Sequence, residues 1–247
     1  MHTSTFFLPA KTPTDAASFL LCEKGSGKFV LTLNTELLAR GICDPDFAAL
    51  IQNAPYRVCD SVGAKLISGL FLPDAPIPRI TGVDLGEGVL RLCALGGIPV
   101  FLLGGKQGVA KAARDSLCAK YPSLQVAGVA HGYFTRRDMP ALRGMIGRSG
   151  AKVVIVCLGS PLQEQWIWEN RDALPQVKLF LPLGGSMDVY ANALPRAPLV
   201  CRQMGLEWLF RLLPAPDPCK RWRRLASSAW ILLSRGREWK AFFEKMK

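Results

Sequence analysis

Asp60 has the residue type and the position that acid–base chemistry needs. It follows the apolar run YRVC (56–59) and precedes a helix-compatible stretch at 62–71, so it lies where a predicted strand ends. A carboxylate in that position could remove the proton from an attacking hydroxyl group. Aspartate is also a favoured N-cap, so Asp60 could instead cap the helix that follows it. The residues alone leave both roles open.

Glycines follow four of the predicted strands, where a ligand would approach the backbone. They are Gly104, Gly105, Gly132, Gly159, Gly184 and Gly185. A glycine lets a ligand come close, and the free amides at the start of a following helix favour phosphate. Each glycine could also serve only to make a tight turn. The chain contains neither G-x-G-x-x-G nor G-x-x-x-x-G-K-[ST], which disfavours an NAD-dependent enzyme and a P-loop ATPase.

The elements that must position these residues are strands and helices in alternation. Apolar or β-rich runs lie at 29–34, 98–105, 124–130, 151–159 and 178–185. Most of them have the composition of strands buried on both faces, and amphipathic stretches separate them. This pattern predicts an α/β fold with a Rossmann-like, mostly parallel sheet and helices on both faces. Ligands of such sheets bind at the carboxyl ends of the strands, where Asp60 and the glycines are predicted to lie.

The C-terminal part of the chain differs from the rest in charge. The formal net charge is +12, and residues 196–247 contain 12 basic and 4 acidic residues together with four of the six tryptophans. We therefore predict an N-terminal lead segment (1–27), an α/β core (28–195) and a basic, helical C-terminal appendage (196–247). Basic side chains interleaved with tryptophan suit an anionic membrane surface. A nucleic-acid-binding module would also be basic, but the chain has no aromatic RNA-binding motif.

Several longer segments carry motifs that can be compared with known families. They are VFLLGGKQGVAKAA (100–113), HGYF (131–134), VCLGSPLQEQWIWENR (156–171) and RAPLVCRQMGLEWLFRL (196–212). The shorter elements TLN (32–34), CDSVG (59–63) and PRITGVDL (78–85) precede them. In this order and spacing, over about residues 28–224, the chain resembles the WecG/TagA/CpsF family of bacterial glycosyltransferases.

The resemblance implies an inverting glycosyltransferase of cell-envelope polysaccharide synthesis, such as exopolysaccharide or teichoic acid. It would move an N-acetylmannosamine-type sugar from a UDP donor to a polyprenyl-diphosphate-linked N-acetylglucosamine. The implied partners are a UDP-N-acetylhexosamine, the lipid-linked acceptor and an anionic membrane surface, with no nucleic acid, no metal and no cofactor. The enzyme would be cytoplasmic and peripheral on the inner face of the cell membrane.

The alternative is a non-enzymatic basic α/β protein that binds nucleic acid or a membrane. The sequence does not identify the donor sugar, the acceptor chain or the oligomeric state.

The resemblance also implies roles for residues near the strand ends. It places the catalytic base on Asp60, although the family usually has P-D-G where this chain has Cys59-Asp60-Ser61. It places substrate-binding roles on Thr32, Asn34, Arg79, Gln163 and Glu164. Glu164 is also the second candidate for the base. An ordinary surface ion pair for Arg79 and a favourable charge at a helix start for Glu164 are the simpler alternatives.

Nucleotide-binding roles are implied for a further set of residues. They are Gly104, Gly105, His131, Tyr133, Gly159, Asp188, Arg211, Arg221 and Arg224. The three arginines would bring positive charge to the UDP diphosphate and so stabilise the leaving group. A structural role for His131, a helix cap at Asp188 and a solvated basic face for the arginines are the alternatives. Pro218 stands where family members commonly have arginine, which puts the contact of the appendage with UDP in question.

Overall fold

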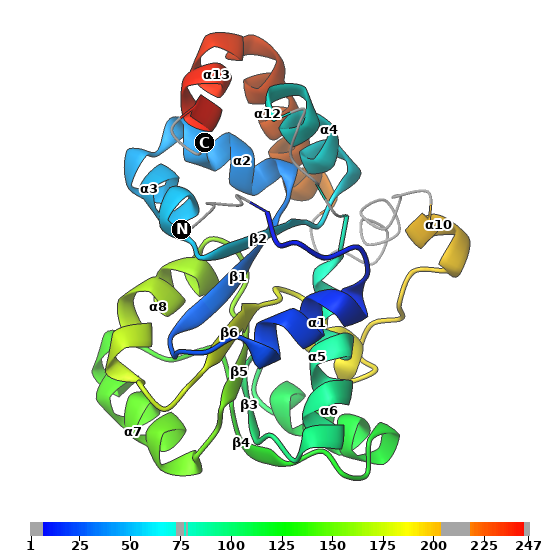
Figure 1. The fold of residues 1–247 in the computed structure, drawn as a ribbon, viewed down its shortest axis with the longest axis vertical. Coiled ribbons are helices and arrows are strands. Elements are labelled where there is room, and N and C mark those ends of the chain that lie inside the picture. Colours follow the sequence, from blue (N-terminus) through cyan, green and yellow to red (C-terminus); the bar gives the residue numbers. More distant parts are fainter. Residues whose placement is uncertain (1–6, 73–76, 78, 204–217, 245–247) are drawn as a thin grey trace.

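The structure is a computed structural model that describes residues 7–72, 77, 79–203 and 218–244 (Figure 1). Within these residues the chain forms one sheet of six parallel strands in the order β2-β1-β6-β5-β3-β4. The strands are β1 (Lys28–Leu33), β2 (Tyr56–Cys59), β3 (Val100–Gly104), β4 (Val126–Ala130), β5 (Val153–Cys157) and β6 (Leu179–Pro182). The predicted parallel α/β fold is confirmed.

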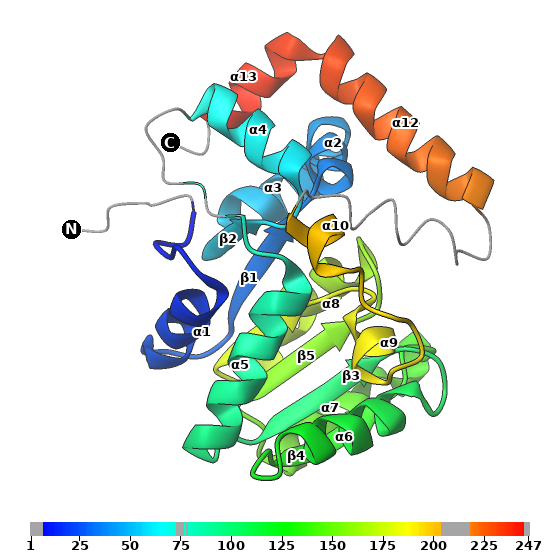
Figure 2. The same cartoon turned by 90° about the vertical axis from the view of Figure 1, so that its right-hand side faces the viewer.

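Helices lie on both sides of this sheet (Figures 1 and 2). They are α1 (Pro13–Cys22), α2 (Thr35–Cys43), α3 (Pro45–Asn53), α4 (Val62–Phe71), α5 (Gly82–Gly96), α6 (Val109–Lys120), α7 (Met139–Ser149), α8 (Leu162–Asn170), α9 (Ser186–Tyr190), α10 (Leu199–Gln203), α12 (Pro218–Ser234) and α13 (Gly236–Glu244). Short 3-10 turns, η1 (Arg136–Asp138) and η2 (Arg171–Ala173), precede α7 and follow α8.

Alternate side chains of each strand enter different hydrophobic cores, as the period of two in a strand requires. In β1, Phe29 and Leu31 pack into a core formed with α2, α3, α7 and α8, whereas Val30 packs into a core formed with α1, α5 and α6. Both faces of β1, β3, β5 and β6 are therefore buried, whereas β4 at the edge of the sheet is only partly buried. This explains why the strands appear in the sequence as continuous apolar runs.

Polar caps fix where the helices near the strand ends begin. The side chains of Asn34, Ser61 and Thr81 accept hydrogen bonds from the amides of Leu37 (2.9 Å), Ala64 (3.1 Å) and Asp84 (3.3 Å). Each of these caps satisfies an amide that the first helical turn leaves without a partner. The cap of α4 is therefore Ser61, and the alternative role of Asp60 as the cap of that helix is wrong.

The last helix joins the main core through aromatic side chains. Trp239 and Phe243 of α13 stack on Phe71 of α4, with ring centroids 6.2 and 5.3 Å away, and Phe242 is buried beside them. Their apolar area is thus unavailable to a membrane. Trp222 and Trp230 of α12, by contrast, are 51 % and 71 % exposed. The predicted boundary after residue 195 stays a prediction.

We predict that Trp239→Ala lowers the free energy of unfolding by about 3–5 kcal/mol, because it empties a buried site among Phe71, Phe242 and Phe243. The matched control is Trp230→Ala, which removes an exposed side chain and should change that free energy by less than about 0.5 kcal/mol. Urea unfolding followed by circular dichroism measures both variants. Equal effects of the two substitutions would contradict the burial of Trp239 between α13 and α4.

Candidate functional site

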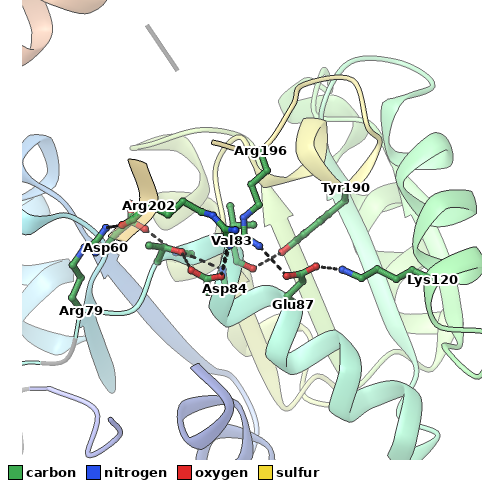
Figure 3. A network of polar contacts seen from close by, with 11 residues as sticks. Asp60, Arg79, Val83, Asp84, Glu87, Lys120, Tyr190, Arg196 and Arg202 are labelled. Carbon is green, nitrogen blue, oxygen red and sulfur yellow. Dashed lines mark hydrogen bonds and ion pairs between the residues drawn. The ribbon is translucent and has the colours of Figure 1, made fainter. Parts of the chain in front are cut away.

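Asp60 lies directly after β2, at the carboxyl edge of the sheet, and is tied to both neighbouring elements. Its amide donates to the carbonyl of Leu33 at the end of β1 (2.8 Å), and its Oδ1 accepts a hydrogen bond from the amide of Gly82 (2.7 Å) (Figure 3). Gly82 is the first residue of α5, so the carboxylate is placed at the N-terminus of that helix. The helix dipole favours the ionised carboxylate there. An ionised, oriented carboxylate is what a general base requires.

Thr32 and Asn34 lie next to Asp60 but both also maintain the fold. A β-carbon added at Gly82 would stand 3.7 Å from Thr32 Cγ2 and 3.9 Å from Asp60 Oδ1, which places both side chains around Gly82. The Thr32 hydroxyl donates to the carbonyl of Pro182 in β6 (3.3 Å), and Asn34 caps α2. The substrate-binding roles of Thr32 and Asn34 stay predictions.

Arg79 reaches the same edge from a third segment. Its backbone pairs with Cys59 as an isolated parallel bridge, and the amide of Ile80 donates to the Cys59 carbonyl (2.9 Å). Its Nη2 donates to the carbonyl of Arg202 in α10 (3.0 Å), and its buried Nε has no hydrogen-bond partner among the described residues. Among the described residues Arg79 forms no ion pair, and its guanidinium instead donates to the backbone of α10. Its guanidinium joins the Asp60 loop to α10.

Gln163 and Glu164 are buried at the start of α8, where they connect the loops after β5 and β6. Gln163 Oε1 accepts from the amide of Gly184 (2.8 Å), and Gln163 Nε2 donates to Glu164 Oε1 (2.8 Å). Glu164 is 1 % exposed, and its Oε2 has no hydrogen-bond partner within the described part of the chain. Burial raises the pKa of the Glu164 carboxyl to about 7, against the opposing effects of Gln163, Ser160 and Arg40.

The predicted nucleotide loops meet one another at the same carboxyl edge, after the strands farthest from β2. The amide of Gly132 donates to the carbonyl of Gly105 (2.9 Å), which joins the loops after β4 and β3. Gly104 has a φ of +135°, and a β-carbon there would stand 2.2 Å from the carbonyl oxygen of Cys157, so close packing of β3 against β5 already requires glycine. Gly159, after β5, has a φ of +78°. A ligand role for these glycines stays a prediction.

His131 and Tyr133 are exposed at the end of β4. His131 Nδ1 accepts a hydrogen bond from the amide of Tyr133 (3.2 Å). A cavity of about 550 Å³ lies beside this loop, and it is lined by Lys111, Val129, His131, Phe134, Leu142 and Met145, among others. The loop therefore combines an apolar hollow with a polar rim, as small-molecule sites do.

The structure gives a position for Asp188 but not for the side chains of the three arginines predicted to contact UDP. Asp188 lies inside α9, whose N-cap position is Gly185, so the alternative of a helix cap at Asp188 is wrong. Arg211 lies outside the described residues. Arg221 and Arg224 lie on α12, but their side chains are outside the described part of the structure.

A network of ion pairs that we did not predict holds residues 196–202 on α5. Arg196 pairs with Asp84 and with Glu87 (3.0 Å in the second pair), and Glu87 also pairs with Lys120 (Figure 3). Arg202 lies 4.0 Å from Asp84. The sequence showed opposite charges in PRITGVDL and RAPLVCR, but nothing in it indicated that these two motifs would meet.

The network keeps Asp84 ionised. Burial acts to raise the pKa of Asp84, but the hydrogen bonds from Thr81 and Arg196 and the charges of Arg196 and Arg202 outweigh it, so the pKa is lowered. Arg79 and Arg202 then connect this network to the Asp60 loop. The site is therefore built from β1, β2, α5, α8 and α10 together.

The sheet defines an α/β protein, and the candidate site lies at the carboxyl edge, where open parallel sheets usually bind their ligands. Residues 10–244 match the Glycosyl transferase WecG/TagA/CpsF family, so the chain belongs to this family. Membership makes the protein a glycosyltransferase of cell-surface polysaccharide synthesis, with a nucleotide-sugar donor and a lipid-linked acceptor. The resemblance seen in the sequence is confirmed.

None of the helices formed by the described residues is both long and apolar enough to cross a bilayer. The same residues include no group of three His, Cys, Asp or Glu side chains arranged to hold a metal ion. Metal independence stays a prediction.

We predict that Glu164 makes the protein less stable as the pH rises. The pKa of its carboxyl is near 4.5 in ordinary surroundings and about 7 in the fold, so the folded state favours the protonated form. Its contribution to stability is fully present below pH 4.5 and is lost as the pH rises through 7. Glu164→Gln should remove this loss and raise the free energy of unfolding at pH 8 by as much as about 3 kcal/mol.

The matched control is Glu169→Gln, an exposed residue of the same helix, which should keep the pH dependence of the wild type. Urea unfolding at pH 5 and pH 8 gives the comparison. A Glu164→Gln variant with an unchanged pH dependence would show that the carboxyl titrates at its ordinary value.

Proposed function

We propose that the protein is an inverting glycosyltransferase that moves an N-acetylmannosamine-type sugar from a UDP donor to a polyprenyl-diphosphate-linked N-acetylglucosamine. The family supports the reaction class, and the donor, the acceptor and the inversion belong to the proposal. The observation that carries it is the Asp60 carboxylate, held at the sheet edge by the Gly82 amide at 2.7 Å, with Thr32 beside the same glycine.

The chemistry is a single displacement. Asp60 takes the proton of the acceptor hydroxyl while that oxygen forms a bond to the anomeric carbon of the donor sugar. The bond from the anomeric carbon to the diphosphate oxygen breaks, and UDP leaves with the electron pair. Because the nucleophile enters opposite to the leaving group, the anomeric configuration inverts. Partial proton removal by a positioned carboxylate contributes on the order of 10²–10⁴-fold to such a rate.

The neighbouring side chains would position the two substrates. The Thr32 hydroxyl oxygen can still accept a hydrogen bond while it donates to Pro182. Arg79 presents a guanidinium suited to a phosphate or carboxylate group. Gln163 and Glu164 would act on sugar hydroxyls, and Gln163 also fixes the loop at Gly184 that borders the site.

The nucleotide would lie over the loops after β3, β4 and β5. Gly104, Gly105 and Gly159 would let the backbone approach it, and His131, Tyr133 and Asp188 would contact the base or the ribose. Arg211, Arg221 and Arg224 would stabilise the departing UDP, so that no metal ion is needed. The support for this part is the family match and the convergence of these loops at Gly132 and Gly105.

The protein would work on the inner face of the cell membrane. A polyprenyl-linked acceptor stays in the bilayer, so the enzyme must reach it there. The helix α12 supports this placement, because its sequence from Pro218 to Ser234 contains four basic residues and no acidic one, and its Trp222 and Trp230 are exposed.

We predict that Asp60→Asn lowers kcat at least about 100-fold and leaves UDP binding within about threefold of the wild type, because the amide cannot accept the proton. The matched control is Asp46→Asn, an exposed residue of α3, which should keep full activity. Turnover is measured as UDP release, and UDP affinity by calorimetry. Turnover of Asp60→Asn within about threefold of the wild type would remove Asp60 as the base.

A further inference from the structure

The helix α4 exposes two large apolar side chains that the fold does not use. Leu66 is 68 % exposed and Leu70 is 74 % exposed. One turn apart at i and i+4, they lie on the same face of the helix. Lys65, also exposed, precedes them. An apolar pair of this kind on a helix surface favours an interaction with something apolar outside the fold.

The opposite face of α4 is anchored firmly in the protein. Ala64 and Ser68 are buried, and Phe71 stacks on Phe243 and Trp239 of α13. The exposed pair is therefore carried by a helix that packs on the last helix of the chain. Figures 1 and 2 show α4, α12 and α13 together at the same end of the molecule.

The helix that carries the exposed pair also begins close to the proposed catalytic base. Ser61, the N-cap of α4, directly follows Asp60. With a rise of about 1.5 Å per residue, Leu66 and Leu70 lie about 8 and 14 Å along the helix axis from that cap. An acceptor sugar held at Asp60 is separated from its lipid only by a diphosphate. The lipid would therefore begin in the same region as this helix.

We propose that α4 is a membrane-contacting helix, and that Leu66 and Leu70 enter the apolar part of the leaflet that holds the lipid-linked acceptor. This inference rests on the proposed function. It adds a second membrane contact, made by residues 62–71, to the one proposed for the basic C-terminal segment. The charge of α12 fits an anionic bilayer, since the first turns of this helix contain Lys220, Arg221, Arg223 and Arg224 and the helix contains no acidic residue. Burial of the two leucines would supply the apolar part of binding, and the basic residues the electrostatic part.

The test uses the full chain and vesicles of phosphatidylglycerol and phosphatidylethanolamine in equal parts. Salt screens the contribution of the basic residues but leaves that of the leucines, so cosedimentation is measured at low and at high salt. The double variant Leu66→Gln/Leu70→Gln should lose the salt-resistant binding, with a fall in vesicle partitioning of about tenfold or more. The matched control is Leu95→Gln on α5, which is 77 % exposed and near the far end of that helix, and which should bind as the wild type does.

Two further measurements separate this inference from the proposed function. The double variant should keep the UDP affinity of the wild type and its turnover with a short-chain, water-soluble acceptor, and should lose turnover with a long-chain acceptor in vesicles. Vesicle binding is measured without any turnover, so a wild type that binds vesicles through α4 yet releases no UDP would contradict only the proposed function.

The inference itself would be overturned by either of two results. One is vesicle binding of the double variant equal to that of Leu95→Gln at both salt concentrations. The other is a change in oligomeric state, measured by light scattering, with unchanged vesicle binding, which would make the exposed pair a contact between copies of the chain.

Discussion

The hydrogen bond between the Gly82 amide and the Asp60 carboxylate joins two parts of the chain that the rest of the site depends on. Asp60 directly follows β2, an edge strand that pairs with β1, and Gly82 is the first residue of the long helix α5, which packs into the second core. The bond fixes the direction of the carboxylate and gives a partner to an amide of the first turn of α5. A proton acceptor and a helix start are thus placed by the same contact.

The charges on α5 extend this arrangement towards the C-terminal residues. Asp84 and Glu87 hold Arg196, and Arg79 donates to the backbone of Arg202. Both segments carry motifs by which the chain resembles its family, RAPLVCR at one end and PRITGVDL at the other. The ion pairs give a physical reason for motifs so far apart in the sequence to lie together, because the segment that holds the Asp60 carboxylate also holds Arg196 and contacts Arg202.

The sheet could be predicted from the sequence because strands buried on both faces leave unbroken apolar runs. The position of Asp60 at a strand end followed from the same pattern. The partner of its carboxylate could not be predicted, because Gly82 is distant in sequence and donates only a backbone amide. The sequence likewise did not indicate that Trp239 is buried while Trp230 is exposed, since both stand among basic and apolar residues. Which side chain is covered depends on how α13 crosses Phe71, and that is a property of the tertiary packing.

The most direct test of the proposed reaction is UDP release from a panel of UDP-N-acetylhexosamines, with a short-chain lipid-diphosphate N-acetylglucosamine as acceptor and EDTA in the buffer. The account predicts release from one donor only when the acceptor is present, and a product of inverted anomeric configuration. Folded protein that neither binds UDP nor releases it from any donor would contradict the assignment of UDP-dependent sugar transfer to the site around Asp60.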